Sequence, residues 1–239
     1  MRISVYFSPE EVERSRLPGA AAVVIDVVRA TSCIVEAVAN GARAVHPVVS
    51  VDEAFRLRAS LGADTLLCGE RRGLRIDGFD LGNSPAEFSR AAVSGKRMVM
   101  TTTNGTRAFA AAAAADHVFT ASFHNQSAVV AALPSDGSVV VVCAGKEGRF
   151  SLDDTVCAGI VVRGLRDRVR EPASLNDGAV AAADLAGTHP VTGDMLAGTA
   201  AGRALVDVGL GSDLALCARA DRHQIVPMMY DGVIKAPRG

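Results

Sequence analysis

The 239-residue sequence lacks the segments that carry a protein into or across a membrane. No uninterrupted apolar run reaches the roughly 20 residues that a membrane-spanning helix needs. The N-terminus, MRISVYFSPEEVE, turns acidic too early for a secretory signal peptide. Apolar residues make up 49% of the chain, enough for a sizeable core. We therefore expect a soluble, cytoplasmic, globular protein with no membrane partner.

Neither sign of charge is in excess. Lys and Arg total 25 and Asp and Glu total 26, so no bulk field attracts nucleic acid or an anionic surface. We expect no nucleic-acid partner. An anionic ligand must therefore be recognised by a local arrangement of residues.

Several motifs of known chemistry are also missing. The five cysteines are scattered and form no CxxC pair, which argues against a disulfide framework or a zinc site and favours reduced thiols. GxGxxG, Walker A, GxSxG and HExxH are absent, so nucleotide-binding and serine-hydrolase interpretations have no support. For His124 and His223 a surface or capping role is the favoured interpretation, and proton transfer is left open.

Short β-branched runs alternate with longer segments of helical period. Runs that are apolar on both faces and separated by helices indicate a parallel sheet covered on both sides. The pattern predicts an α/β fold with three layers, α/β/α, around a largely parallel or mixed sheet. The predicted strands are residues 3–7, 21–28, 65–68, 96–101, 117–120 and 138–144.

The sequence also predicts helix starts and the domain organisation. Ser50 with Glu53, and Ser84 with Glu87, fit the capping box, and the alanine-rich stretch 108–115 predicts a helix. No linker divides the chain, so we predict a single domain over 1–239. From about Asn176 the sequence predicts successive helices before one or two closing strands in 223–236, which leaves a second, more helical lobe open.

Four strand-to-helix junctions are unusually polar. In an open α/β sheet, ligands bind at the carboxyl ends of strands. Each junction alone is more simply explained by helix capping, but four that converge would bring carboxylates, arginines and helix N-termini to one edge. We therefore predict a polyanion site there. The junctions are residues 25–32, 68–85, 101–107 and 143–159.

The third junction, TTTNGTR, predicts an anion-binding turn, because hydroxyls and backbone N–H groups at a helix start favour phosphate. The orientation of Arg107 is left open. The carboxylates of the other junctions suggest Mg²⁺, which is held by one or two carboxylates, water and substrate phosphate.

Cys143 and Arg149 have the spacing of cysteine-dependent phosphatases, but Glu147 lies between them, and a buried structural Cys143 is the favoured interpretation.

Six segments together resemble the 2-phosphosulfolactate phosphatase family, and they cover nearly the whole chain in family order. The resemblance implies a Mg²⁺-dependent phosphatase that converts 2-phospho-3-sulfolactate to 3-sulfolactate and phosphate, as in coenzyme M biosynthesis, on a family-specific α/β topology. SLDDTV departs from the family pattern by placing Asp153 where glutamate is favoured. The segments are AAVVIDVVRATSCIVEAVANGA, GERRGLRIDGFDLGNSPAEF, MTTTNGTRAF, SFHNQSAVVAAL, VVCAGKEGRFSLDDTVCAG and GLGSDLALCARAD followed by VP.

Within these motifs, roles are assigned by chemistry. Metal ligands are expected at Asp26, Glu70 and Asp154, with Asp80 and Asp153 in reserve. Catalytic roles are expected for Asp26, Arg29, Glu70 and Arg149. The expected substrate-binding residues are Thr31, Arg71, Asn83, Ser84, Thr102, Thr103, Asn104, Gly105 and Thr106.

We expect in-line attack by a metal-activated water on a small polyanionic phosphorylated substrate. Attack by a carboxylate such as Asp26 or by the Cys143 thiolate is left open. Two other functions are also left open: hydrolysis of another small phosphorylated hydroxy acid, and anion binding without catalysis. A homodimer is neither indicated nor excluded.

Overall fold

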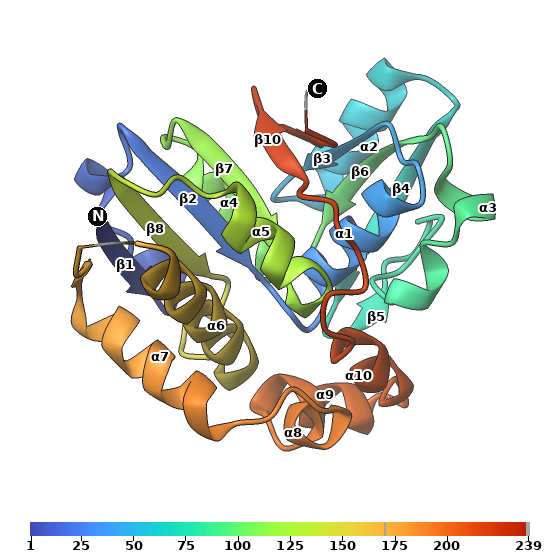
Figure 1. Cartoon of the computed structure of the whole chain (residues 1–239). Coiled ribbons are helices and arrows are strands. Elements are labelled where there is room, and N and C mark those ends of the chain that lie inside the picture. The colour runs from blue at the N-terminus through green and yellow to red at the C-terminus, as the bar shows by residue number, and fades with distance from the viewer. Residues whose placement is uncertain (170, 238–239) are drawn as a thin grey trace.

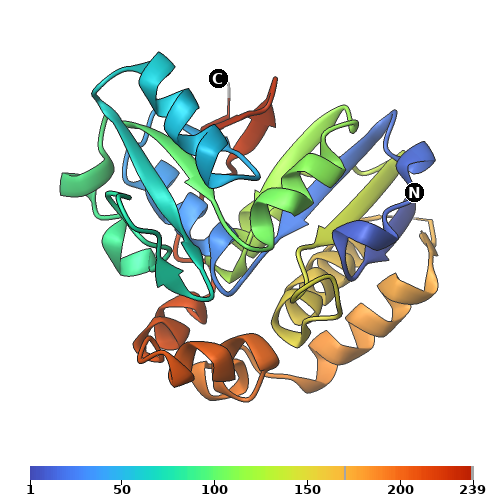
Figure 2. The same ribbon diagram turned by 180° about the vertical axis from the view of Figure 1, so that it is seen from behind.

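The computed structural model describes residues 1–169 and 171–237. It confirms the predicted α/β fold, in which a mixed β-sheet lies between two layers of helices (Figures 1 and 2). Strands β1, β2, β4, β6, β7 and β8 correspond to the six predicted runs. The sequence pattern missed β3, β5 and β9, which are two to four residues long. The strands are β1 Arg2–Tyr6, β2 Ala20–Ile25, β3 Ala44–Pro47, β4 Thr65–Arg71, β5 Leu74–Arg75, β6 Arg97–Thr101, β7 His117–Ala121, β8 Ser138–Cys143, β9 Ser174–Leu175, β10 Met228–Tyr230 and β11 Val233–Lys235.

Helices follow most strands, and both predicted capping positions are occupied as expected. The Ser50 hydroxyl accepts a hydrogen bond from Glu53 N at 3.1 Å, and the Glu87 carboxylate accepts one from Ser84 N at 3.1 Å. Within residues 1–169 and 171–237, no helix is long and apolar enough to cross a membrane. The α-helices are α1 Ala30–Ala39, α2 Val51–Leu61, α3 Arg90–Val93, α4 Gly105–Ala112, α5 Gln126–Ala132, α6 Leu152–Arg168, α7 Asp177–Thr188, α8 Gly193–Ala197, α9 Ala200–Asp207 and α10 Ser212–Cys217, and a short 3-10 helix spans Pro85–Glu87.

The sheet consists of two parallel halves joined by an antiparallel hairpin. Strands β4, β6 and β3 are parallel neighbours, as are β7, β2, β8, β1 and β9. The hairpin β10–β11, which the sequence predicted as one or two strands, pairs with β7 on one side and β3 on the other. The two halves splay apart around it. Their carboxyl ends approach one another at the end of the molecule covered by α8, α9 and α10 (Figures 1 and 2).

The core lies on both faces of the sheet. Alternate residues of β2 point to opposite sides: Ala21, Val23 and Ile25 pack with residues of α5, α6 and α7, whereas Ala22 and Val24 pack with residues of α1 and α4. These five side chains are at most 4% exposed. Burial on both faces explains why the strand reads as an uninterrupted apolar run.

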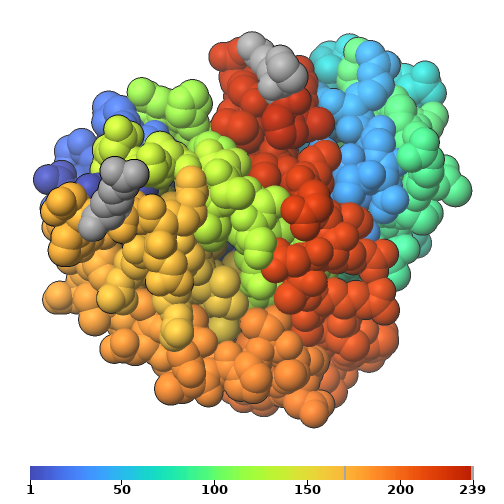
Figure 3. Space-filling view, in the orientation of Figure 1, coloured from blue at the N-terminus to red at the C-terminus, as the bar shows by residue number. Residues whose placement is uncertain are grey.

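The chain after residue 176 contributes to both layers. Helix α7 packs against α6, helices α8 to α10 cover the strand ends, and the last described residues enter the central sheet as β10 and β11. In Figure 3 these C-terminal residues, in red, form a band between the two halves of the molecule. The C-terminal segment therefore joins the halves and also closes the end at which the polar junctions meet.

Candidate active site

A cavity of about 290 Å³ lies at the carboxyl ends of β2, β4, β6 and β8. All four polar junctions contribute to its wall, so the convergence expected from the sequence is present. Helix α9 supplies the opposite wall. The lining residues are Asp26, Val28, Arg29, Glu70, Arg72, Gly73, Asn83, Thr103, Asn104, Gly145, Lys146, Glu147, Ser151, Asp153, Asp154, Ala201, Ala204, Leu205, Asp207 and Val208.

Asp26 stands directly after β2 and is 6% exposed. Its Oδ1 accepts a hydrogen bond from Ala30 N at 3.0 Å, which orients the carboxyl group at the start of α1. No hydrogen bond from the described residues reaches its Oδ2. A Cβ atom at Gly105 would lie 2.7 Å from this Oδ2. Glycine at position 105 therefore allows the start of α4 to approach the Asp26 carboxylate.

Two other carboxylates connect neighbouring loops. Glu70 accepts hydrogen bonds from Thr103 N and Gly73 N, both at 2.7 Å. Asp154 accepts hydrogen bonds from Val27 N at 2.8 Å and Gly145 N at 3.0 Å. Each carboxylate accepts one backbone hydrogen bond from its own junction and one from another junction, so each acid holds two junctions together.

Arg29 is a buried cation that joins three segments. Its Nη1 lies 2.6 Å from Asp213 Oδ2 on α10, and its Nη2 donates to Gly73 O at 2.6 Å. Asp213 Oδ1 accepts a hydrogen bond from Ser84 Oγ at 2.7 Å. The Arg29 and Asp213 side chains are only 2% and 5% exposed. This ion pair fixes the covering helix α10 to the loops that follow β2 and β4.

The cavity concentrates negative charge. Burial raises the pKa of Asp26 to about 7, and the nearby carboxylates of Asp153 and Glu70 add to this effect. Burial also raises the pKa of Asp153. It raises the pKa of Asp154 well above its usual range, with further contributions from Asp153 and Asp26. Three neighbouring carboxyl groups therefore bind protons more tightly than they do in water, which marks a functional-site candidate.

The structure places the predicted site residues in two groups. Asp26, Arg29, Glu70, Asn83, Thr103, Asn104, Asp153 and Asp154 line the cavity, whereas Thr31, Arg71, Asp80, Ser84, Thr102, Gly105, Thr106 and Arg149 do not. Thr31, Thr102 and Thr106 form local hydrogen bonds that stabilise the helix starts.

The cations of the cavity differ from those expected. Arg71 turns away and donates to Thr101 Oγ1 at 3.0 Å, and Arg149 is exposed. Their places are taken by Arg72 and Lys146, which line the cavity. Arg107 also lies outside the lining and pairs with Glu10 at 2.7 Å.

Cys143 does not face the cavity. Its side chain is 0% exposed, and burial raises the pKa of its thiol well above the usual value. A nucleophilic cysteine needs a lowered pKa and access to substrate. The structure therefore supports the structural interpretation of Cys143.

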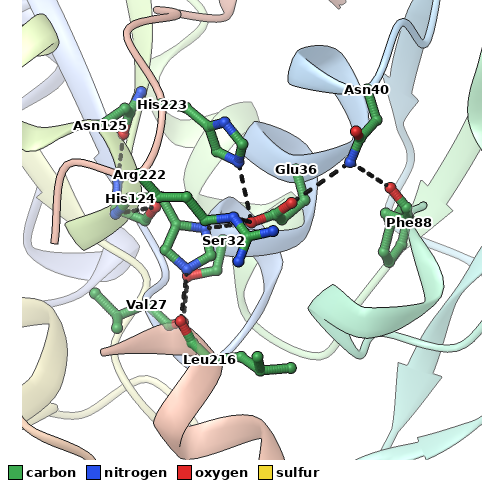
Figure 4. A network of polar contacts seen from close by, with 11 residues as sticks. Val27, Ser32, Glu36, Asn40, Phe88, His124, Asn125, Leu216, Arg222 and His223 are labelled. Carbon is green, nitrogen blue, oxygen red and sulfur yellow. Dashed lines mark hydrogen bonds and ion pairs between the residues drawn. The ribbon is translucent and has the colours of Figure 1, made fainter. Parts of the chain in front are cut away.

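His124 and His223 lie in a separate polar cluster on α1 (Figure 4). Glu36 Oε1 is 3.4 Å from His124 Nδ1, 3.1 Å from His223 Nε2 and 3.0 Å from Arg222 Nε. The second ring nitrogen of His124 lies 2.9 Å from Leu216 O. Neither histidine lines the cavity, so the cluster attaches the chain after α10 to α1.

The described residues contain no group of three or more His, Cys, Asp or Glu side chains arranged to hold a metal ion. Asp26, Glu70 and Asp154 thus do not form a three-carboxylate cage. The physical reason is that Glu70 and Asp154 direct both oxygens to backbone N–H groups. Mg²⁺ commonly uses only one or two carboxylates, with water and substrate phosphate as further ligands. Asp26 Oδ2 accepts no hydrogen bond from the described residues, and Asp153, whose Oδ1 accepts one from Ser151 Oγ at 2.5 Å, lines the same cavity.

The fold and cavity define an α/β protein with a polar, carboxylate-rich ligand site at the carboxyl ends of its strands. The family model for 2-phosphosulpholactate phosphatase matches residues 6–232. The chain is 35% identical to the probable 2-phosphosulfolactate phosphatase of Clostridium acetobutylicum, over 98% of this chain and 100% of that protein. Identity is 39% to the protein of the same name from Clostridium perfringens strain 13, over 98% and 96% of the two chains, and 41% to that from Symbiobacterium thermophilum, over 91% and 94%. The chain belongs to the 2-phosphosulfolactate phosphatase family, which confirms the resemblance in the sequence.

We predict that Asp213→Asn destabilises the protein by about 3 kcal/mol, because it leaves the buried Arg29 guanidinium without a counter-charge. Urea unfolding measures the change. Asp194→Asn, at an exposed position in the same covering segment, is the matched control and should unfold like the wild type. Equal stability of the two variants would show that the ion pair does not hold α10 in place.

We also predict that, without a divalent cation, the protein is more stable near pH 5 than near pH 8. The folded-state pKa of Asp26, about 7, lies above the ordinary value of 3.8, so its favourable contribution is complete below about pH 4 and is lost as the pH rises through about 7. Thermal unfolding at several pH values in the presence of a chelator measures this dependence of stability on pH. Asp26→Asn should make the dependence weaker, and Asp153 and Asp154 should account for the part that is left. An unchanged dependence in Asp26→Asn would contradict the raised pKa of Asp26.

Proposed function

We propose that the protein is a Mg²⁺-dependent phosphatase that hydrolyses 2-phospho-3-sulfolactate to 3-sulfolactate and phosphate, the type of reaction found in coenzyme M biosynthesis. Family membership supports the phosphatase class. The observation that carries the proposal for this chain is the meeting, in one small cavity, of buried carboxylates with Arg29, Arg72 and Lys146. This combination suits a substrate whose negative charges must be bound beside a metal.

The charge balance of the cavity supports a metal. Acidic residues outnumber basic ones in the lining, so a substrate with phosphate, carboxylate and sulfonate groups would meet net repulsion. A divalent cation held by the carboxylates would offset that repulsion. We assign Asp26 and Asp153 as its carboxylate ligands, and Glu70 and Asp154 as the residues that position the surrounding loops. Bound Mg²⁺ supplies charge stabilisation at the phosphoryl group and activates water.

The third junction offers neutral donors for the phosphate. Thr103 Oγ1 is buried without a hydrogen-bond partner among the described residues. Asn104 Oδ1 accepts from Glu147 N at 3.1 Å, which leaves the side-chain N–H groups of Asn104 as donors. We assign both residues to the phosphate, with Asn83 beside them in the lining. Neutral donors of this kind bind and orient the group that is transferred.

The cations have separate roles in the proposal. Arg29 is held rigidly by Asp213 and Gly73, which suits it to a fixed position near the transferring phosphoryl group. Lys146 is half-buried and Arg72 is exposed, so their mobile side chains suit the carboxylate and sulfonate. Water attacks in line with the leaving oxygen, and Asp26 Oδ2 accepts a hydrogen bond from that water.

Purified protein should release inorganic phosphate from 2-phospho-3-sulfolactate when Mg²⁺ is present and should lose this activity in chelator. We predict that Asp26→Asn lowers kcat by at least roughly a hundredfold, as expected for loss of a group that stabilises the transition state. Asp194→Asn is again the matched control. Phosphate release measured by colorimetric assay decides the result.

The same assay separates the alternatives. Faster release from another phosphorylated hydroxy acid would replace the proposed substrate and keep the phosphatase. Saturable binding of phosphorylated acids without phosphate release, under conditions in which the protein is folded and Mg²⁺ is present, would contradict catalysis and support an anion-binding protein.

We predict that Cys143→Ala retains most of the phosphatase activity, because the thiol is buried, protonated and outside the cavity. Steady-state kinetics with Mg²⁺ measure the effect, and circular dichroism controls for folding. Loss of activity in a folded Cys143→Ala variant, together with insensitivity to chelator, would favour the thiolate mechanism instead.

A further inference from the structure

A second polar pocket lies at the opposite end of the half-sheet from the candidate active site. Its volume is about 330 Å³, and its lining consists of Arg43, Ala44, His46, Arg97, Val233 and Lys235. Arg97 begins β6, whereas Thr101 ends this strand beside the candidate active site. Thr101 is four positions along the strand from Arg97, a separation of about 13 Å. We propose that this pocket binds a small anion that carries a phosphate group.

Strand alternation brings the lining residues together. Ile234 pairs with Val45, and both side chains are 0% exposed in the core. Their neighbours Val233 and Lys235 on β11, and Ala44 and His46 on β3, therefore point to the other face of the sheet.

Arg97 joins the same face from β6, because it is the register partner of Ala44. The small Ala44 side chain leaves a hollow between the long basic side chains. Arg43, which precedes β3, borders the hollow as well.

The basic side chains of the pocket have no carboxylate partner in the part of the chain that the structure describes. In residues 1–169 and 171–237, Arg43, Arg97 and Lys235 form no ion pair within 4.0 Å. Asp64 is the acid whose charge interacts with Arg43 and Arg97, but its carboxylate lies 3.0 Å from Lys96 Nζ. Like charges close together on one sheet face are destabilising. An anion that binds between them removes this repulsion.

The chemistry of the lining selects the class of ligand. Two guanidinium groups, an ammonium group and an imidazole provide many donors and no acidic side chain. Guanidinium groups bind phosphate oxygens through paired hydrogen bonds. Burial lowers the pKa of His46, and Lys235 and Arg97 lower it further, which places His46 within the field of both cations.

The pocket also lies at a seam of the fold. It spans β11 and β3, which share one register pair among the described residues, Ile234 and Val45, and this seam joins the C-terminal hairpin to one parallel half of the sheet. A ligand that contacts Lys235 on β11 and Arg97 on β6 would reinforce the seam. Phosphate binding should therefore raise the unfolding temperature as well as occupy the pocket.

The His46 side chain provides a local measurement. NMR follows the histidine ring signals of the full chain through a pH titration. The titration is repeated with inorganic phosphate, glycerol phosphate or chloride at equal ionic strength. The His46→Gln variant identifies the His46 signal, because that signal is missing from its spectrum. We predict that phosphate or glycerol phosphate raises the pKa of His46 saturably, because the bound anion offsets the neighbouring cations, and that chloride does not. A response to glycerol phosphate at lower concentration than to inorganic phosphate would identify a phosphate ester as the ligand, and the reverse order would identify phosphate itself.

Variants test the site independently of catalysis. Arg97→Gln and Lys235→Gln should each weaken phosphate binding by roughly tenfold, whereas Arg90→Gln, at an exposed arginine on α3, should bind like the wild type. Asp26→Asn should leave the His46 response unchanged, which separates this pocket from the active site. A linear response that chloride reproduces, or binding as tight as that of the wild type in both Arg97→Gln and Lys235→Gln, would overturn the proposal.

Discussion

The structure depends on how buried charges are compensated where the strand ends meet. Arg29 and Asp213 are 184 positions apart in the sequence, and both side chains are almost fully buried. Removing two charges from water costs several kcal/mol each, and only close geometry and further hydrogen bonds offset that cost. Gly73 O and Ser84 Oγ supply those bonds. The pair therefore fixes a single position of α10 relative to the loops after β2 and β4, and with it one shape of the cavity.

Asp26 is compensated less completely, and this difference separates it from the supporting residues Glu70 and Asp154. Glu70 and Asp154 each receive two backbone hydrogen bonds, one from their own junction and one from a neighbouring junction. Asp26 receives one at Oδ1 and none from the described residues at Oδ2, although burial raises its pKa to about 7. A buried carboxylate with an open oxygen is costly without a cation. Proteins keep such destabilising groups at sites that bind a ligand or a metal.

Periodicity predicted six strands, the layered fold and the convergence of four junctions, because burial on both faces leaves a local apolar signal. It did not predict β3, whose AVHP sequence is short and contains a proline. Arg71 was misplaced for a different reason: it ends β4, whereas Arg72 lies in the following turn with a φ of 54° and lines the cavity. The pattern thus did not decide between Arg71 and Arg72. Asp213 carried no local signal, since its partner Arg29 is distant in sequence.

The connection from α10 to the C-terminal hairpin explains how one segment both covers the cavity and joins the half-sheets. It passes over α1, where Glu36 contacts Arg222 and His223 from this connection and His124 from the segment before α5 (Figure 4). Arg29 stands at the other end of α1 and holds α10 through Asp213. Helix α1 therefore carries two attachments for the same segment, one at the cavity and one on the path to β10. Because both belong to one rigid helix, the position of the covering helices and the docking of the hairpin are mechanically linked.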